Sequence, residues 1–476
     1  MKTKKLISTF SILFALLFMI SCDNGFEETN TNPNDPSSVP SNLLLGGILR
    51  ATSNRIQNTS LVGESNLCWM QQLSKPQYNN GDLYDPRTGG IQSLWDVLYS
   101  SAIADAQKMY ALAVEEGNAK NQAIALVLQA FSFQILTDAF GDVPFTEAAL
   151  GDSGNFTPAY DSSETVYNGI LALLDQAIPL FDKSGDIDAS QDLLYGGDAS
   201  KWKKFAASLK FRAIMRISDA PNFTVGNQLQ NLVNSGNLFT SNAEEAKLLY
   251  LSAPPNANPY YSIVQSGRGK EWSMGENLVK MMDGTIFGVF DNRLTIYAKK
   301  TSDNTYRGLP AGLSSNPGND FTDPISEIGD YFLKAEGYGY FMTYSQLSFL
   351  MAEAAEKNYI SGSAATYFKN GIQASFNSVG ASLGNYPTTY SGGEAGLKQI
   401  AEQEYIALFL QGYEAWAEWR RKKIPALTPA PAGVINQIPS RYSYPQDEQA
   451  DNVENYKNAV SSQGSDVLTT PIWWMK

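Results

Sequence analysis

The chain is dominated by long segments in which apolar residues recur every three or four positions. Residues 119–140 show the pattern most clearly, with Ile124, Val127, Leu128, Phe131 and Ile135. This spacing places the five side chains on one face of an α-helix, and Gly141 and Pro144 supply its stop. Because a helix with one apolar face has to bury that face, the pattern predicts a fold in which helices pack on helices.

Further helices are predicted where the same spacing returns: residues 43–61, 64–74, 91–116, 163–182, 199–218, 344–359, 364–378 and 396–423. Short turns join several of these segments into pairs: 91–116 with 119–140, 163–182 with 199–218, and 344–359 with 364–378. Asp161 with Glu164 should cap the helix at 163–182, and Pro179 should kink the last turn of that helix. We therefore predict a mainly α fold of tetratricopeptide-like stacked helix pairs.

The predicted helix at 199–218 carries a run of basic residues: Lys201, Lys203, Lys204, Lys210, Arg212 and Arg216. Its apolar positions, among them Trp202 and Phe205, predict the packed face. Long basic side chains can cover apolar surface with their stems while the charge stays in water. We expect these six side chains to be solvated.

No linker divides residues 41–476, so the sequence predicts one large domain. Residues 253–343 interrupt the helical order, because Gly, Pro, Asn and Asp separate short stretches that carry many aromatic residues. Long irregular segments inside a compact domain are usually functional. We expect a loop-rich insert that takes part in ligand binding.

The chain begins like an exported protein. Lys2, Lys4 and Lys5 precede an uncharged run at residues 6–20, which is too short to span a bilayer, and Ser21 and Cys22 follow. The placement resembles the bacterial lipobox, so residues 1–21 are predicted to be a lipoprotein signal peptide and Cys22 to be acylated. Residues 22–40 are rich in turn formers and acids and are predicted to be a flexible tether. The alternative is an ordinary signal cut near a chance cysteine.

Two scarce residue types limit the possible chemistry. The chain contains no histidine, which removes Ser-His-Asp and Cys-His nucleophile systems and zinc sites that use imidazole. With Cys22 assigned to lipid, Cys68 has no disulfide partner and is expected to be a small buried residue. A carboxylate glycosidase remains conceivable, but no spacing singles out a pair of acids.

The net charge of −13 makes nucleic acid an improbable partner, because phosphate backbones are held by clustered Lys and Arg. No cofactor is predicted from the sequence. A calcium site remains open, since oxygen-ligand sites need no fixed motif outside the EF-hand pattern.

Six short segments stand out along the chain: residues 31–34 (TNPN), 69–72 (WMQQ), 140–145 (FGDVPF), 349–354 (FLMAEA), 412–421 (GYEAWAEWRR) and 441–445 (RYSYP). In their order and spread they resemble the SusD/RagB family of Bacteroidetes outer-membrane nutrient-binding lipoproteins, especially its SusD-like branch. Residues 291–294 (DNRL) look like another recurrent stretch of the family, for which an internal ion pair is the simplest account. Asp23, Glu27 and Glu28 look like the acidic signal that sends such lipoproteins to the cell surface.

The resemblance implies a helical, non-enzymatic protein that sits as a lid on a TonB-dependent (SusC-like) outer-membrane transporter. Such a lid binds an oligosaccharide and delivers it inward. Two alternatives remain open: a lid that binds peptide, and a structural transporter subunit that binds no solute.

Glycan recognition needs flat aromatic faces for the sugar C–H surface and amide, carboxylate or guanidinium groups for the hydroxyls. Residues 77–87 and the loop-rich insert both offer this combination. The candidate ligand contacts are Tyr78, Asn80, Tyr84, Arg87, Trp272, Asn277, Tyr297 and Tyr306. For each aromatic, packing into the core is the competing interpretation.

Overall fold

The computed structural model describes residues 39–314 and 324–476. Residues Ser41–Lys476 form one compact unit. The predicted signal peptide, Cys22 and all but the last two residues of the predicted tether lie outside the described residues.

The first part of the unit alternates α-helical and π-helical turns. Its elements are α3 (Asn42–Ile56), η1 (Thr59–Asn66, π-helical), α4 (Leu67–Trp69), α5 (Thr88–Val97), η2 (Leu98–Ile103, π-helical) and α6 (Ala104–Glu115). The helix predicted at 43–61 therefore ends earlier, and the one predicted at 64–74 is mostly not α-helical. The side chain of Asn58 accepts a hydrogen bond from Leu61 N and so begins η1 as a separate element.

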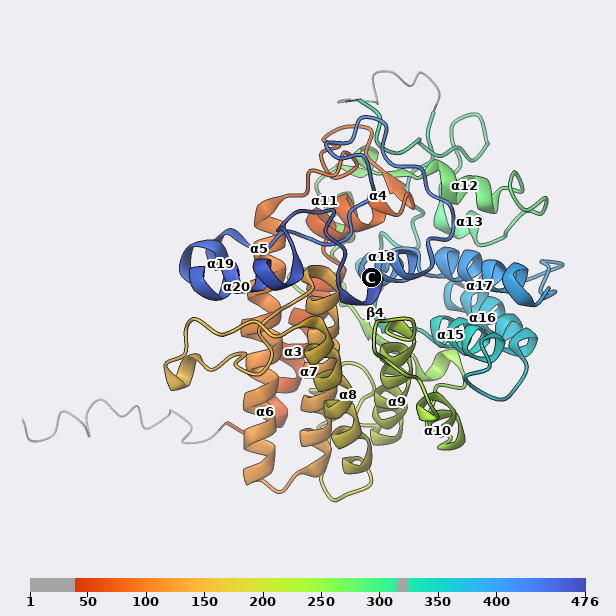
Figure 1. Cartoon of the computed structure of the whole chain (residues 1–476). Coiled ribbons are helices and arrows are strands. Elements are labelled where there is room, and N and C mark those ends of the chain that lie inside the picture. Colours follow the sequence, from red (N-terminus) through yellow and green to blue (C-terminus); the bar gives the residue numbers. More distant parts are fainter. Residues whose placement is uncertain (1–38, 315–323) are drawn as a thin grey trace, which may run out of the picture. The chain divides into compact units, whose positions relative to one another are not determined.

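Helix α7 (Ala119–Phe140) has the predicted bounds and forms the centre of the helical layer. It packs between α6 and α8 (Ser163–Leu180), and α9 (Ala199–Arg216) follows against α8, so that the four helices lie side by side (Figure 1). Among the described residues, α7 is the one helix long and apolar enough to cross a membrane, and its whole apolar stretch is buried within the protein. The arrangement confirms the predicted tetratricopeptide-like helix pairs.

Two local predictions in this layer are wrong. Helix α8 is capped by Ser162, whose side chain accepts from Thr165 N, whereas Asp161 accepts from Phe145 N and Thr146 N. On α9, three of the basic side chains expected in solvent, Lys210, Arg212 and Arg216, are buried. Acceptors on neighbouring helices make their burial possible, since a buried charge has to be paired and hydrogen-bonded.

The second helical group consists of α15 (Tyr344–Glu356), α16 (Ala364–Val379), α17 (Gly393–Ala407) and α18 (Gly412–Lys422). The single helix predicted at 396–423 is thus two helices. Leu410 between them has φ 62°, a left-handed backbone that no α-helix contains. The turn brings Gly412 against η1, where a Cβ would lie 2.6 Å from Val62 Cγ1.

A buried ion-pair network ties α9, α15, α17 and α18 together. Arg216 of α9 pairs with Glu418 of α18 at 3.0 Å. Glu353 of α15 pairs with Arg421 at 2.5 Å and with Lys422 at 3.2 Å. Lys422 also pairs with Glu404 of α17. Arg421 joins two helices, because its carboxylate partners Glu353 and Glu418 belong to α15 and α18.

Strands are short and pair two by two. β1 (Leu73–Ser74) is antiparallel to β3 (Ser273–Met274), and β2 (Ala246–Leu249) is antiparallel to β4 (Tyr338–Met342). Where the structure describes it, the predicted insert, residues 253–343, contains β3, β4 and four short helices: α11 (Tyr261–Gln265), η5 (Gly269–Glu271), α12 (Glu276–Met282) and α13 (Leu294–Tyr297). The remaining short helices are α10 (Gln228–Asn234), η3 (Gly151–Ser153), η4 (Asn242–Glu244), α19 (Gln446–Asp451), α20 (Val453–Gln463) and η6 (Trp473–Met475).

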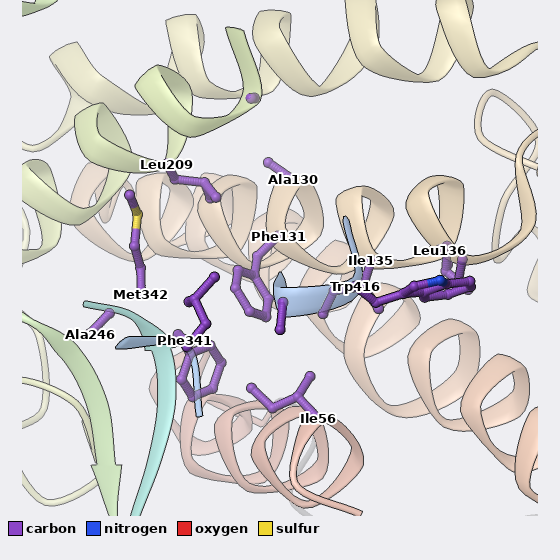
Figure 2. Packing of buried hydrophobic residues seen from close by; sticks show 14 of the residues in the cluster. Ile56, Ala130, Phe131, Ile135, Leu136, Leu209, Ala246, Phe341, Met342 and Trp416 are labelled. Carbon is purple, nitrogen blue, oxygen red and sulfur yellow. The ribbon is translucent and has the colours of Figure 1, made fainter. Parts of the chain in front are cut away.

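The core joins segments that are far apart in the sequence. Figure 2 shows Phe131 of α7 beside Phe341 of β4, with ring centroids 5.0 Å apart, and Ile56 of α3 close by. Trp69 and Trp416 meet edge to face at 5.1 Å. Each such fully buried large side chain contributes on the order of 1.5–3 kcal/mol.

Candidate functional site

The two sequence stretches predicted to hold a ligand are neighbours in the structure. β1 lies just before residues 77–87 and pairs with β3, so that Ser74 faces Ser273. Asn277 donates a hydrogen bond to the side chain of Gln71, and Asn79 donates to the carbonyl of Leu313 at 3.1 Å. The pairing places the 77–87 loop beside the segment that contains Trp272.

The 77–87 loop is held tightly against η1. Trp69 Nε1 donates to Gly81 O at 2.9 Å, and a Cβ on Gly81 would lie 1.6 Å from Glu64 O, so only glycine fits there. Tyr78 and Tyr84 both have positive φ, 54° and 65°. Non-glycine residues in this region cost of order 1–3 kcal/mol each and cluster at functional sites.

Beneath the loop lies a fully buried lysine. Lys75 Nζ is 3.3 Å from Glu64 Oε1 and 3.9 Å from Glu271 Oε2, and it sits 4.1 Å from the centroid of the Trp272 ring. Trp272 itself is 3% exposed, and a Cβ on Gly63 would lie 2.6 Å from its ring. Trp272 therefore supports the loop from below.

Each of the two carboxylates near Lys75, Glu64 and Glu271, also pairs with an arginine that reaches solvent. Arg87 Nε is 2.6 Å from Glu64 Oε2, and its side chain is 55% exposed. Arg268 pairs with Glu271 at 2.5 Å, and this hydrogen bond lowers the pKa of Glu271 and raises that of Arg268. Tyr78 is 60% exposed. We call Tyr78, Asn80, Arg87 and Arg268 the tyrosine–arginine surface.

The structure divides the predicted contacts. Tyr78, Asn80 and Arg87 are exposed, and Asn80 donates to Asp85 at 2.9 Å. Asn277 is partly buried. Tyr306 is also partly buried and lies against Phe290, with ring centroids 6.0 Å apart.

Three predicted contacts require correction. Tyr84, Trp272 and Tyr297 are each no more than 3% exposed, so their faces are covered by the protein and do not offer a stacking surface. Tyr84 accepts a hydrogen bond from Ala430 N, and Tyr297 stacks on Phe409 at 4.6 Å. Packing against residues distant in the sequence decides their burial.

Sequence reasoning did not single out Arg268, Glu64, Glu271 or Lys75. The sequence did contain a sign of Arg268 and Glu271, because both charged residues come shortly before Trp272 in a polar stretch that contains glycine. Glu64 and Lys75 could not have been found in this way, since nothing in the local sequence shows that they meet.

Cys68 lies under the same loop as a buried residue, as predicted. Its thiol donates to Gly63 O at 3.3 Å, and burial together with the nearby carboxylate of Asp82 raises its pKa well above the usual value. A thiol that stays protonated is a poor nucleophile. Within residues 39–314 and 324–476, no group of three or more Cys, Asp or Glu residues is placed to hold a metal ion.

A family model agrees with the fold and with the sequence motifs. The model for SusD-like proteins, described as starch-binding and associating with the outer membrane, matches residues 33–445. The chain belongs to the SusD-like family. The resemblance drawn from the motifs is thus confirmed, and the predicted ion pair of the DNRL stretch is present as Asp291 with Arg293 at 2.6 Å, both side chains being fully buried.

Solved structures of other SusD homologues share the fold. One from Bacteroides uniformis is 23% identical and covers 91% of this chain and 99% of its own, with a TM-score of 0.78. A chitin-binding homologue from Flavobacterium johnsoniae is 24% identical, with the same coverage and TM-score. One from Bacteroides vulgatus is 21% identical, covers 91% of this chain and 97% of its own, and has a TM-score of 0.79. Among curated proteins, none matches this chain.

Proposed function

We propose that this SusD-like protein is a cell-surface lipoprotein that binds an oligosaccharide at the tyrosine–arginine surface. It then delivers the sugar to a TonB-dependent outer-membrane transporter and performs no chemistry on it. The observations that carry the proposal are the exposed ring of Tyr78 and the exposed guanidinium groups of Arg87 and Arg268, each held by a carboxylate, in a protein whose family is described as starch-binding.

The geometry suits a sugar in two ways. The exposed face of Tyr78 can pack on sugar C–H groups, and the arginines can donate planar pairs of hydrogen bonds to hydroxyl oxygens. Glu64 and Glu271 hold the two guanidinium groups in place before a ligand arrives, which reduces the entropy lost on binding. The buried Lys75 and Trp272 make the base of the surface rigid.

The test is binding of maltooligosaccharides and chitooligosaccharides, measured by isothermal titration calorimetry on the chain and on Tyr78→Ala and Arg268→Ala. Tyr78→Ala removes an aromatic contact worth about 0.5–1.5 kcal/mol and should therefore weaken sugar binding about two- to tenfold. Phe156→Ala is the control, because Phe156 is 79% exposed and does not belong to the surface. Unchanged affinity in both variants would show that the ligand binds elsewhere.

The same samples separate the competing functions. Binding with a flat time course of sugar cleavage supports a transport protein, whereas release of shorter sugars would establish a glycosidase. Binding of peptides in place of sugars would favour the peptide-binding alternative. Co-purification with a transporter and no binding of either class would indicate a structural subunit.

Membrane attachment is tested by Cys22→Ala. A lipid-anchored protein should then move from the membrane fraction to the soluble fraction and keep its sugar affinity, while uptake of the sugar by the cell should fail. Persisting uptake would show that the anchor is not needed for delivery.

A further inference from the structure

We propose that the protein has a second sugar-binding site, separate from the tyrosine–arginine surface, which takes a single sugar ring. The site is a cavity of about 120 Å³ beside β4. Its lining includes Gln57, Tyr331, Phe332, Tyr338, Tyr340 and Phe409. None of the residues that line this cavity belongs to the tyrosine–arginine surface.

Strand β4 turns two tyrosines toward the cavity. Tyr338 and Tyr340 are two positions apart and so lie on the same face of the strand, with ring centroids 6.1 Å apart. The residue between them, Gly339, faces the opposite way and presses on α3, where a Cβ would lie 2.2 Å from Ser53 Oγ. The close approach to α3 fixes the strand and with it the direction of both tyrosines.

The remaining aromatic rings are held by their own contacts. Tyr331 donates a hydrogen bond to Ser378 O at 3.0 Å, and its ring meets Phe332 edge to face at 5.0 Å. Phe332 in turn meets Phe409 at 5.2 Å. These contacts keep the aromatic walls in place without a ligand, which favours binding of a rigid apolar face.

The decisive polar group is the side chain of Gln57. Gln57 is 4% exposed, yet its amide makes no hydrogen bond to any residue that the structure describes, although its backbone N–H is bound to Ser53 O at 3.0 Å. Its side-chain oxygen and nitrogen are not sealed from solvent, so they reach the cavity and can exchange water for a ligand. Because Gln57 lines this cavity, a ligand inside it can supply the missing partners.

A second, smaller cavity of about 30 Å³ has Gln57 and Tyr340 in common with the first. Ile56, Phe131, Ile135 and Phe341 form its apolar lining, and Figure 2 shows how these four side chains lie. Its polar lining includes Tyr413, whose buried hydroxyl has no hydrogen-bond partner among the described residues. This cavity can therefore accept a hydroxyl or a water beside the larger one.

Size and chemistry together indicate a sugar ring. At about 120 Å³ the cavity is several times the ~10–15 Å³ that a single water needs, so it has room for a ligand larger than water. Aromatic walls suit the C–H faces of the ring, and an amide with free donors and an acceptor suits its hydroxyls. Burial raises the pKa of the Tyr340 hydroxyl, so this group stays protonated and can donate.

The experiment compares two variants of the cavity lining with a control variant outside it. Glucose and N-acetylglucosamine are titrated into the full mature chain, and binding is followed by saturation-transfer NMR and by crystal soaking. Tyr338→Ala should weaken monosaccharide binding about two- to tenfold, because Tyr338 is 40% exposed and its loss leaves the core intact. Phe156→Ala, which belongs to neither site, should leave monosaccharide binding unchanged. Gln57→Met, which keeps the volume and removes the amide, should weaken binding in the same direction as Tyr338→Ala.

Sugar density in the cavity together with the Tyr338→Ala effect supports the second site, whatever the outcome at Tyr78. If neither monosaccharide enters the cavity, or if Tyr338→Ala and Gln57→Met bind as tightly as the unchanged chain, the inference is overturned. That result would leave the tyrosine–arginine surface untouched, because the Tyr78→Ala and Arg268→Ala variants test it with oligosaccharides.

Discussion

At the scale of single residues, aromatic side chains in neighbouring segments have different roles, because some are exposed and others are buried. Tyr78 and Trp272 belong to neighbouring segments, but the tyrosine is exposed and the tryptophan is covered by Gly63 and Lys75. An exposed ring can contact a ligand, and a buried ring can only affect the ligand through the shape of the protein. Measurements of stability distinguish the two roles.

Trp272→Ala should lower the free energy of unfolding by about 3–5 kcal/mol, because it removes a buried aromatic ring and leaves a cavity next to a buried charge. Tyr78→Ala should change it by no more than about 0.5 kcal/mol, as is usual for an exposed side chain. Urea unfolding followed by fluorescence and circular dichroism measures both. Equal stabilities of the two variants would contradict the buried placement of Trp272.

At the scale of elements, the apolar spacing predicted most long helices, and side chains at their ends determined where they begin. Helix α9 begins after Asp198, whose carboxylate accepts hydrogen bonds from Ser200 N and Lys201 N. Two of the bounds that failed, at 43–61 and 396–423, are those where a helix is interrupted although its apolar spacing continues. Packing of Gly412 on η1 explains the second interruption, and no local signal marks it.

Removal of the α9 cap gives a quantitative check on this argument. Asp198→Ala should destabilise the protein by about 1 kcal/mol, because two backbone N–H groups lose their acceptor. Asp198→Asn keeps a side-chain oxygen at the same place and should stay close to the unchanged protein. A urea midpoint that shifts equally in both variants would indicate that the charge, and not the cap, is what matters.

At the scale of the whole molecule, the ion-pair network joins α9, from the middle of the chain, to α15, α17 and α18, which come later. Burial alone would raise the pKa of Glu353, but the attraction of Arg421 and Lys422 outweighs it and lowers the pKa below its usual value. Burial raises the pKa of Glu404 to about 8 against the attraction of Lys422. The two carboxyls therefore give stability opposite dependences on pH.

Below pH 4.5, the usual value for a glutamate, the unfolded chain binds a proton at Glu353 that the folded chain does not, so stability should fall as the pH falls. Between 4.5 and about 8 the folded chain keeps a proton on Glu404 that the unfolded chain has released, so this group should lower stability as the pH rises. Urea midpoints measured across this range test both slopes. Glu353→Gln should flatten the slope below pH 4.5, and Glu404→Gln should flatten the slope between pH 4.5 and about 8. Slopes that neither variant changes would assign the titration to other groups.

The sequence alone determined the helical class, the pairing of the helices and the family, because these depend on the spacing of apolar residues and on motifs that are local in the chain. It also singled out the two stretches that the structure brings together, and three of its eight predicted contacts, Tyr78, Asn80 and Arg87, are exposed there.

Only the tertiary structure decided which side chains of the site are available to a ligand. Burial of Trp272 and Tyr84, pairing of Lys75 with Glu64, and the aromatic cavity around Gln57 all join residues from separate segments. Local spacing tells which side of a helix is apolar, but the burial of a loop residue depends on what packs over it. For this protein, those covering residues come from elsewhere in the chain.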